Sequence, residues 1–179
     1  IIGAGAAGLM CGIEAGKRGR RVLILEHAAK VGAKILISGG GRCNFTNLQV
    51  DPEAFVSENR HFCKSALSRF TPADFIKMVE AHGIAYHEKK LGQLFCDASA
   101  RKIVELLLEE CRKVEASIQV STAVHSIKKE DGLFQLLVNQ EWTAASSLVV
   151  ATGGLSLPKV GATDFGYRIA QQFGLQIVP

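Results

Sequence analysis

The first eight residues, Ile1-Ile2-Gly3-Ala4-Gly5-Ala6-Ala7-Gly8 (IIGAGAAG), carry the pattern G-x-G-x-x-G after an apolar start. This pattern predicts a strand, a tight glycine turn and a helix whose first N–H groups face a pyrophosphate. Gly3 permits the turn, Gly5 lets the phosphates approach the backbone, and Gly8 allows close packing of helix on strand. We therefore expect this turn to bind a dinucleotide cofactor through five residues: Gly3, Gly5, Ala6, Ala7 and Gly8.

The residues after the turn complete the expected βαβ unit. A helix is predicted to about Lys17, Gly19 stops it, and the apolar run 22–25 predicts a buried strand that ends in Glu26. A carboxylate at this place can accept hydrogen bonds from both adenosine ribose hydroxyls and would repel a 2′-phosphate. The pattern predicts an adenine dinucleotide and leaves NAD and FAD open.

Composition narrows the protein class. The chain has 179 residues, of which 47% are apolar and 21% charged, as in an ordinary globular domain with a core. The formal net charge of +4 is too small to argue for a nucleic-acid partner, so none is expected. No apolar run approaches the roughly twenty residues of a membrane helix, so no membrane partner is expected either. The oligomeric state stays open.

Cysteine and histidine usage gives no sign of a metal. The five cysteines include no C-x-x-C pair, and the five histidines show no H-E-x-x-H spacing. We therefore expect no metal site, a reducing compartment and, by default, a cytoplasmic location. The two ends suggest a fragment, since only Ile1-Ile2 precede the glycine turn and a strand or linker starts at 174–179.

The middle of the chain does not continue the βαβαβ alternation of a nicotinamide Rossmann domain. Thr71-Pro72-Ala73-Asp74 predicts the start of a helix that Gly83 ends, and a second helix is expected from Asp97 or Ser99 to about Val114. Residues 84–96 between them predict a hairpin that turns near Leu91-Gly92.

A β-meander is predicted next, at about 118–145. Its strands are expected at 119–128 and 133–138, joined around Asp131-Gly132, with a third beginning near Glu141. The apolar run 148–150 then predicts a parallel strand that ends in Ala151-Thr152-Gly153-Gly154. Small residues at the carboxyl edge of such a sheet favour ligand contact, so all four are candidate cofactor-binding residues.

Three stretches together resemble the YhiN/BaiN-like flavoproteins, a family that includes proteins called aminoacetone oxidases. They are the fingerprint with Glu26, the run 34–47 (KILISGGGRCNFTN) and the run 151–158 (ATGGLSLP). The resemblance implies an α/β, Rossmann-like FAD-binding domain of the glutathione-reductase type, with the β-meander inserted and both ends incomplete. Residues 1–179 would be its N-terminal part, and an inserted substrate or cap domain and the C-terminal completion would lie outside it.

The resemblance also implies further FAD contacts. The cofactor would lie along Ser38, Gly39, Gly40, Gly41, Arg42 and Asn44, with the glycines making room and the polar side chains binding it. Consecutive N–H groups can form an anion nest, and Arg can pair with phosphate or polarise the flavin. Val124 would touch the adenine through its backbone, and Lys34 would reach the ribose side.

The catalytic residues stay unknown. Cys43 lies in the glycine stretch, but no resolving cysteine is near it in sequence, so a buried, inert thiol is expected. Since flavin carries the redox chemistry itself, we expect an FAD-dependent oxidoreductase that moves a hydride between flavin and a small organic substrate, either an amine or an unsaturated carbon centre. The fragment alone would be inactive. An NAD-dependent dehydrogenase domain and a non-catalytic dinucleotide-binding module are the alternatives.

Overall fold

A short parallel sheet carries the glycine turn. β1 (Leu23–Leu25) pairs in parallel with β5 (Ser117–Gln119), and Ile2 forms parallel bridges to Leu25 on one side and Val150 on the other. The order across the sheet is therefore β5, β1, Ile2 and Val150. The computed structural model describes residues 1–156, 158 and 161–178.

The chain forms two compact units, residues Ile1–Lys34 with Leu107–Pro179, and residues Ile35–Leu106. The first holds the parallel sheet, and we call it the sheet unit. The second is the hairpin unit. The expectation that residues 1–179 are part of one larger domain with a cap stays a prediction.

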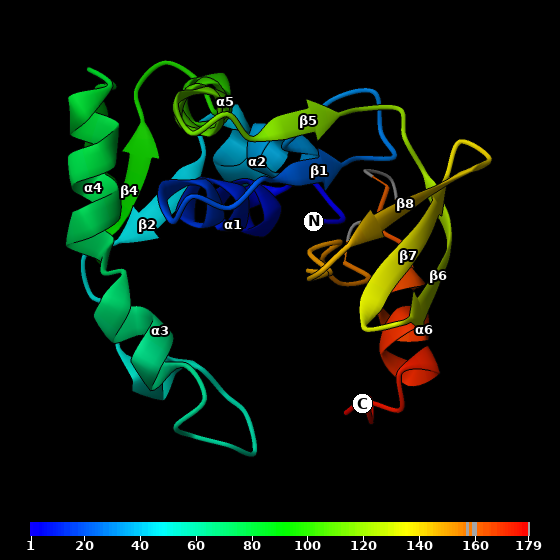
Figure 1. The fold of residues 1–179 in the computed structure, drawn as a ribbon. Coiled ribbons are helices and arrows are strands. Elements are labelled where there is room, and N and C mark those ends of the chain that lie inside the picture. The colour runs from blue at the N-terminus through cyan, green and yellow to red at the C-terminus, as the bar shows by residue number, and fades with distance from the viewer. Residues whose placement is uncertain (157, 159–160, 179) are drawn as a thin grey trace. The chain divides into compact units, whose positions relative to one another are not determined.

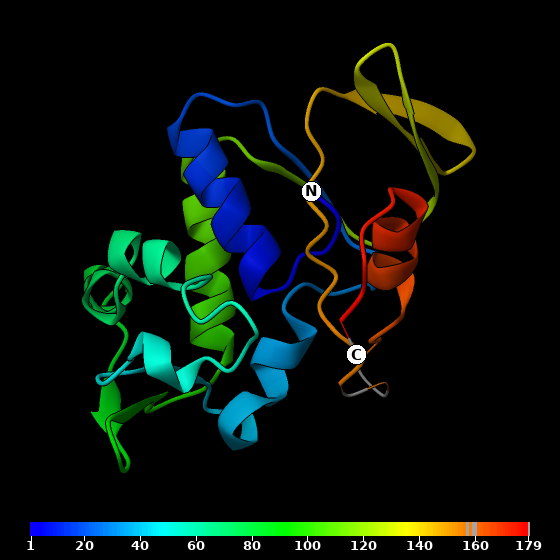
Figure 2. The ribbon, with the colours of Figure 1, turned by 90° about the horizontal axis from the view of Figure 1, so that it is seen from below.

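The helix that follows the glycine turn packs on the parallel sheet. α1 (Ala6–Lys17) buries Leu9 and Ile13 completely, and a Cβ on Gly12 would lie 2.7 Å from Ile24 Cδ1. α1 also packs against the C-terminal part of α5 (Arg101–Lys113), and Figure 2 shows the two helices side by side. At this contact Cys111 Sγ lies 3.6 Å from Leu9 O. The predicted helix to Lys17 is confirmed.

The β-meander and α6 are the remaining elements of the sheet unit. β6 (Val124–Glu130), β7 (Leu133–Val138) and β8 (Glu141–Ala145) form an antiparallel sheet beside α6 (Phe165–Gln172), as Figure 1 shows. Ile127, Leu136 and Ile169 share one core cluster with Ile2 and Leu25, so the meander and α6 pack on residues of the parallel sheet.

The meander starts later than predicted. The expected single strand 119–128 is two strands, because β5 belongs to the parallel sheet and the chain then turns before β6 begins at Val124. Ser121 takes a φ of 51°, and the N–H groups of Ser121 and Thr122 donate to Ala28 O and Glu26 O. These bonds hold the turn against the end of β1.

The hairpin unit contains a second antiparallel sheet, in the order β2 (Asn44–Asn47), β4 (Gln93–Cys96), β3 (Tyr86–Glu88). The predicted hairpin at 84–96 is confirmed, with Leu91 and Gly92 both at positive φ. Phe45 packs edge-on against Phe75 and Tyr86, which joins the sheet to α4 (Pro72–Ala81).

Four short helical elements, α4 and the first part of α5 complete the hairpin unit. Thr71 and Asp74 form a full capping box at the start of α4, as the sequence predicts. The four short elements are α2 (Ala33–Ile37), which starts in the sheet unit, η1 (Ser38–Gly41), η2 (Pro52–Ala54) and α3 (Lys64–Arg69).

Among the residues described, no helix is long and apolar enough to cross a membrane. The cytoplasmic location stays a prediction.

Candidate functional site

The glycine turn in the sheet unit is shaped by two close backbone approaches. Gly3 has a φ of 103°, and a Cβ there would lie 2.5 Å from Ala151 O. A Cβ on Gly8 would lie 1.8 Å from Gly3 O, so only glycine lets α1 begin against this turn. Two of the three fingerprint glycines are therefore required by the packing of the protein itself.

Gly5 has a different role. It is the N-cap of α1 without a side-chain cap, and a Cβ on it would meet nothing within 4 Å. Ala6 and Ala7, the first two helical residues, are exposed. Because the first N–H groups of a helix have no partner inside it, this open end can donate to an anion at the positive end of the helix dipole.

Glu26 fixes a carboxylate beside the same turn. It is 8% exposed, and its Oε2 accepts a hydrogen bond of 2.8 Å from Ala4 N while Oε1 accepts one of 2.9 Å from Ala28 N. His27 Nδ1 lies 3.0 Å from Oε1. Each carboxylate oxygen can accept more than one hydrogen bond, so capacity for ligand hydroxyls remains.

The small residues after Val150 lie directly against the glycine turn. Ala151 N donates to Ile2 O at 2.8 Å, and Gly153 has a φ of 75°. Beyond them, a Cβ on Gly166 of α6 would lie 2.7 Å from Thr152 Oγ1, and one on Gly154 would lie 3.4 Å from Tyr167 Oη. The sheet unit thus gathers the fingerprint, Glu26 and the run 151–154 at the carboxyl edge of the parallel sheet.

Lys34 belongs to this group through contacts that the sequence does not reveal. Its Nζ donates to Gly154 O and to Ser156 Oγ, both at 3.3 Å. The structure therefore places its ammonium at the 153–156 turn, and its predicted reach to a ribose stays a prediction. Val124 is buried at the start of β6, where its backbone pairs with Val138.

The second glycine stretch lies in the hairpin unit as a left-handed turn. The φ angles of Gly39, Gly40 and Gly41 are 56°, 68° and 84°. A Cβ on Gly39 would lie 2.6 Å from Phe95 Cε1, whereas one on Gly40 would meet nothing within 4 Å. Packing accounts for Gly39, and the space beside Gly40 is open to a ligand.

The polar residues of this stretch are largely engaged with the protein. Ser38 Oγ donates to Ile35 O at 2.8 Å, and Arg42 O accepts from Cys96 N at 3.0 Å. Asn44, with its amide oriented to suit its neighbours, donates to Thr46 O and Leu94 O. Arg42 is exposed, and among the described residues its side chain has no hydrogen-bond or ion-pair partner. Whether these residues touch a cofactor stays a prediction.

Cys43 is buried, as expected, and the residue is 5% exposed. Burial raises the pKa of its thiol, and a hydrogen bond with Ser38 partly offsets this. Because the thiolate is the reactive form, a raised pKa makes this cysteine a poor nucleophile at neutral pH.

Residues 1–179 match, over their whole length, the family described as HI0933-like protein Rossmann domain. The chain belongs to this family. The fold class predicted from the sequence, a Rossmann-like FAD-binding fold, and the resemblance to YhiN-type and BaiN-type proteins are confirmed.

Curated relatives resemble this chain along its full length. It is 56% identical over 179 residues to the ribosomal RNA dihydrouridine synthase of Escherichia coli (strain K12), of which it covers 45%. It is 28% identical over 182 residues to the 3-dehydro-bile acid delta(4,6)-reductase of Clostridium scindens, of which it covers 44%. The chain thus spans less than half the length of the curated relatives it matches.

Solved structures show the same fold at low sequence identity. The 3-ketosteroid-Δ4-(5α)-dehydrogenase of Rhodococcus jostii RHA1 gives a TM-score of 0.57 at 16% identity, over 86% of this chain and 45% of that one. The glycine oxidase of Geobacillus kaustophilus gives 0.54 at 16% identity, over 98% of this chain and 58% of that one. The HI0933-like chain therefore has the Rossmann-like fold found in these oxidoreductases.

Proposed function

We propose that the HI0933-like chain is the cofactor-binding part of an FAD-dependent reductase that saturates the C5=C6 bond of a uridine in ribosomal RNA. The observation that carries this proposal is the 56% identity, over all 179 residues, with the Escherichia coli ribosomal RNA dihydrouridine synthase. Of the two substrate classes that the sequence left open, the proposal favours an unsaturated carbon centre over an amine.

The chemistry is the reduction of a carbon–carbon double bond conjugated to a carbonyl. In uridine, C6 is the electrophilic end of the C5=C6 bond, so a hydride adds at C6 and a proton adds at C5 to give dihydrouridine. FAD, once reduced by a nicotinamide nucleotide, would supply the hydride. The Clostridium scindens relative is, by its name, also a reductase.

The residues of the sheet unit fit the adenosine diphosphate half of FAD. The open N-terminus of α1 at Gly5 suits the pyrophosphate, and the buried Glu26 carboxylate suits the adenosine ribose hydroxyls. The space at Gly40, in the hairpin unit, adds a second place where backbone can approach a ligand. We assign no catalytic residue among the described side chains.

An RNA substrate departs from the expectation of no nucleic-acid partner. That expectation rests on a net charge of +4 for the whole chain and on the lack of a basic stripe with interleaved aromatic residues in the sequence. The net charge says nothing of how the cations are distributed. A local group of cations is enough to contact a few phosphates.

The test uses the full-length protein with protein-free, unmodified bacterial ribosomal RNA and NADPH or NADH. The RNA is digested to nucleosides and analysed by mass spectrometry. We expect dihydrouridine only when protein and nicotinamide nucleotide are both present, and much less with Gly5→Leu, which fills the open N-terminus of α1. A flavin-loaded protein that forms no dihydrouridine from this RNA would overturn the proposal. Preferential NADH binding without flavin uptake would favour a nicotinamide dehydrogenase.

A further inference from the structure

One segment of the hairpin unit, residues 51–70, contains no buried residue. It nevertheless carries large apolar side chains: Phe55 is 48% exposed, Val56 99% and Phe62 80%. Phe70 at its end is 36% exposed. Several large exposed apolar groups within one short segment are a candidate interaction surface, since single scattered ones are ordinary on a protein surface.

Cations alternate with these aromatic groups. From Arg60 to Phe70 the sequence is RHFCKSALSRF, with three cations and no acidic residue, because the three acidic residues of the segment, Asp51, Glu53 and Glu58, all precede Arg60. Among the described residues, no ion pair is formed by Arg60, Lys64 or Arg69, and all three are exposed. Unpaired cations interleaved with exposed aromatic rings suit single-stranded RNA, because the cations contact phosphates while the rings stack on bases.

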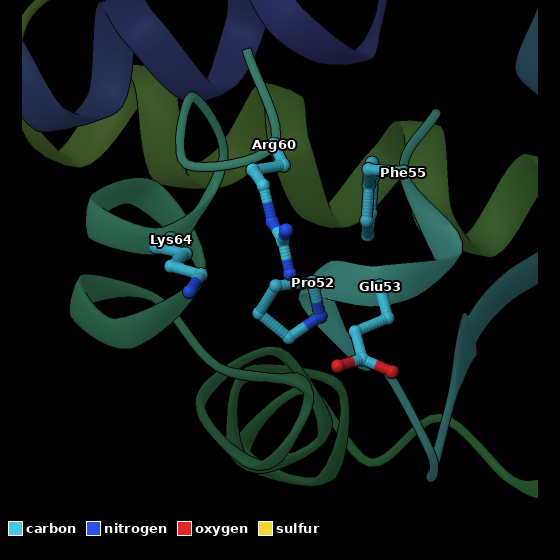
Figure 3. A pocket seen from close by; sticks show the side chains of 5 residues that line it. All are labelled: Pro52, Glu53, Phe55, Arg60 and Lys64. Atoms are coloured by element: carbon cyan, nitrogen blue, oxygen red, sulfur yellow. The ribbon is translucent and has the colours of Figure 1, made fainter. Parts of the chain in front are cut away.

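The same segment forms an open hollow of about 350 Å³ lined by Pro52, Glu53, Phe55, Arg60 and Lys64. Figure 3 shows the Arg60 and Lys64 side chains extending toward Pro52, with the Glu53 carboxylate on the other side of that ring. None of the predicted cofactor-binding residues lines this hollow.

Local hydrogen bonds hold the shape of this hollow despite its exposure. Asp51 Oδ1 accepts from Glu53 N at 2.8 Å, and Asn59 Oδ1 accepts from His61 N at 3.1 Å. Cys63, the N-cap of α3, lies with its Sγ 3.7 Å from Pro52 O, which links the two helical elements of the segment. The cations and rings are therefore presented by a loop with defined internal contacts.

We propose that the 51–70 segment binds a single-stranded stretch of the ribosomal RNA substrate. Arg60 and Lys64 contact phosphates, and Phe55 and Phe62 stack on bases. This inference rests on the proposed function, since it names the surface that receives the RNA of that reaction.

The test measures binding of protein-free bacterial ribosomal RNA to the full-length protein across a range of salt concentrations. Arg60→Glu/Lys64→Glu should weaken binding at least about tenfold and lower the slope of log affinity against log salt, by roughly 0.7 for each phosphate that the protein no longer neutralises. Phe62→Ala should weaken binding about fivefold or more, because one base no longer stacks, and leave the salt slope unchanged.

The matched control is Arg20→Glu/Arg21→Glu, which makes the same change in net charge on exposed residues of the sheet unit. We expect this control to weaken RNA binding much less than Arg60→Glu/Lys64→Glu does. An equal loss of binding in the control would attribute the effect to overall charge and overturn the proposal. Unchanged binding by both variants of the segment would also overturn it.

The melting temperature of the RNA-free protein and the formation of dihydrouridine by wild type distinguish a failure of this inference from a failure of the proposed function. If Phe62→Ala markedly lowers the melting temperature of the RNA-free protein, Phe62 is packed against other parts of the protein and the RNA assignment is wrong. If wild type forms no dihydrouridine, the proposed function fails while RNA binding by the segment can still be measured. If wild type forms dihydrouridine and the segment variants bind RNA normally, only the present inference fails.

Discussion

The Glu26 carboxylate accepts a hydrogen bond of 2.8 Å from the backbone N–H of Ala4, so the acid that ends β1 is tied to the glycine turn that precedes α1. Its other oxygen accepts from Ala28 N. A ligand bound by this carboxylate is thereby held at a fixed place relative to the N-terminus of α1. The ribose and pyrophosphate contacts of a dinucleotide require such a fixed separation.

Glu26→Gln should therefore weaken both cofactor binding and folding. An amide has one acceptor oxygen, so its NH₂ group would face the N–H of Ala4 or Ala28, and one buried donor would lose its partner. We expect a loss of about 1 to 3 kcal/mol in the free energy of unfolding, measured by urea denaturation, and a weaker FAD titration. Glu58→Gln, at an exposed carboxylate, should change neither, and a stable Glu26→Gln with normal FAD affinity would contradict the role given to Glu26.

The fingerprint glycines offer a second, paired test. Gly8→Ala places a Cβ that would lie 1.8 Å from Gly3 O, so the backbone must move and stability should fall by about 1 to 3 kcal/mol or more. Gly5→Ala meets nothing within 4 Å, so it should cost only about 0.5 kcal/mol for the poorer N-cap, less than Gly8→Ala, but reduce FAD affinity by narrowing the phosphate site. Equal effects of the two substitutions on both quantities would contradict the separate roles of these glycines.

Lys34→Met should loosen the 153–156 turn. The substitution removes the two hydrogen bonds from Nζ to Gly154 O and Ser156 Oγ while keeping much of the aliphatic chain. Because Lys34 is only half-buried, we expect a loss of about 1 kcal/mol, with faster amide hydrogen exchange in the turn. Lys30→Met, at an exposed lysine, is the control, and identical exchange in the two variants would show that the Lys34 contacts do not hold the turn.

Two buried thiols predict how stability changes in alkali. Burial raises the pKa of Cys111 to about 11, and burial together with the nearby Cys43 thiol raises the pKa of Cys96 to about 11, both from 9.0. The folded state then holds these protons more tightly than the unfolded state. Their contribution is complete below about pH 9 and is lost as the pH rises toward 11.

The midpoint of urea denaturation should accordingly fall between pH 9 and 11. Cys111→Ala, which cannot ionise, should flatten part of this fall, whereas Cys63→Ala, at a half-buried thiol, should leave it unchanged. A pH profile that is the same for wild type and Cys111→Ala would show that this thiol does not cause the fall.

Local signals made much of the fold predictable. The glycine pattern at Gly3, Gly5 and Gly8 predicts the turn and α1, and the Thr71 to Asp74 run predicts the capping box of α4, because each feature depends on residues a few positions apart. The hairpin turn at Leu91-Gly92 was predictable for the same reason, since it depends on two adjacent residues.

Contacts between distant residues were not predictable from one sequence. The strand at Ser117–Gln119 is separated from the meander because it pairs with Leu23–Leu25, far earlier in the chain, and nothing local distinguishes it from the start of β6. The Lys34 contact with Gly154 and the packing of Phe95 on Gly39 are hidden for the same reason. The cations of the 51–70 segment were visible in the sequence, but their exposure beside Phe62 was not.

The absorption spectrum of the purified full-length protein, with mass identification of any cofactor released by heat, tests the central claim most directly. The proposed function, in which the glycine turn and Glu26 hold FAD, predicts flavin bands and the release of FAD. A colourless protein that also fails to take up added FAD would contradict the assignment of this chain as the FAD-binding part of a reductase.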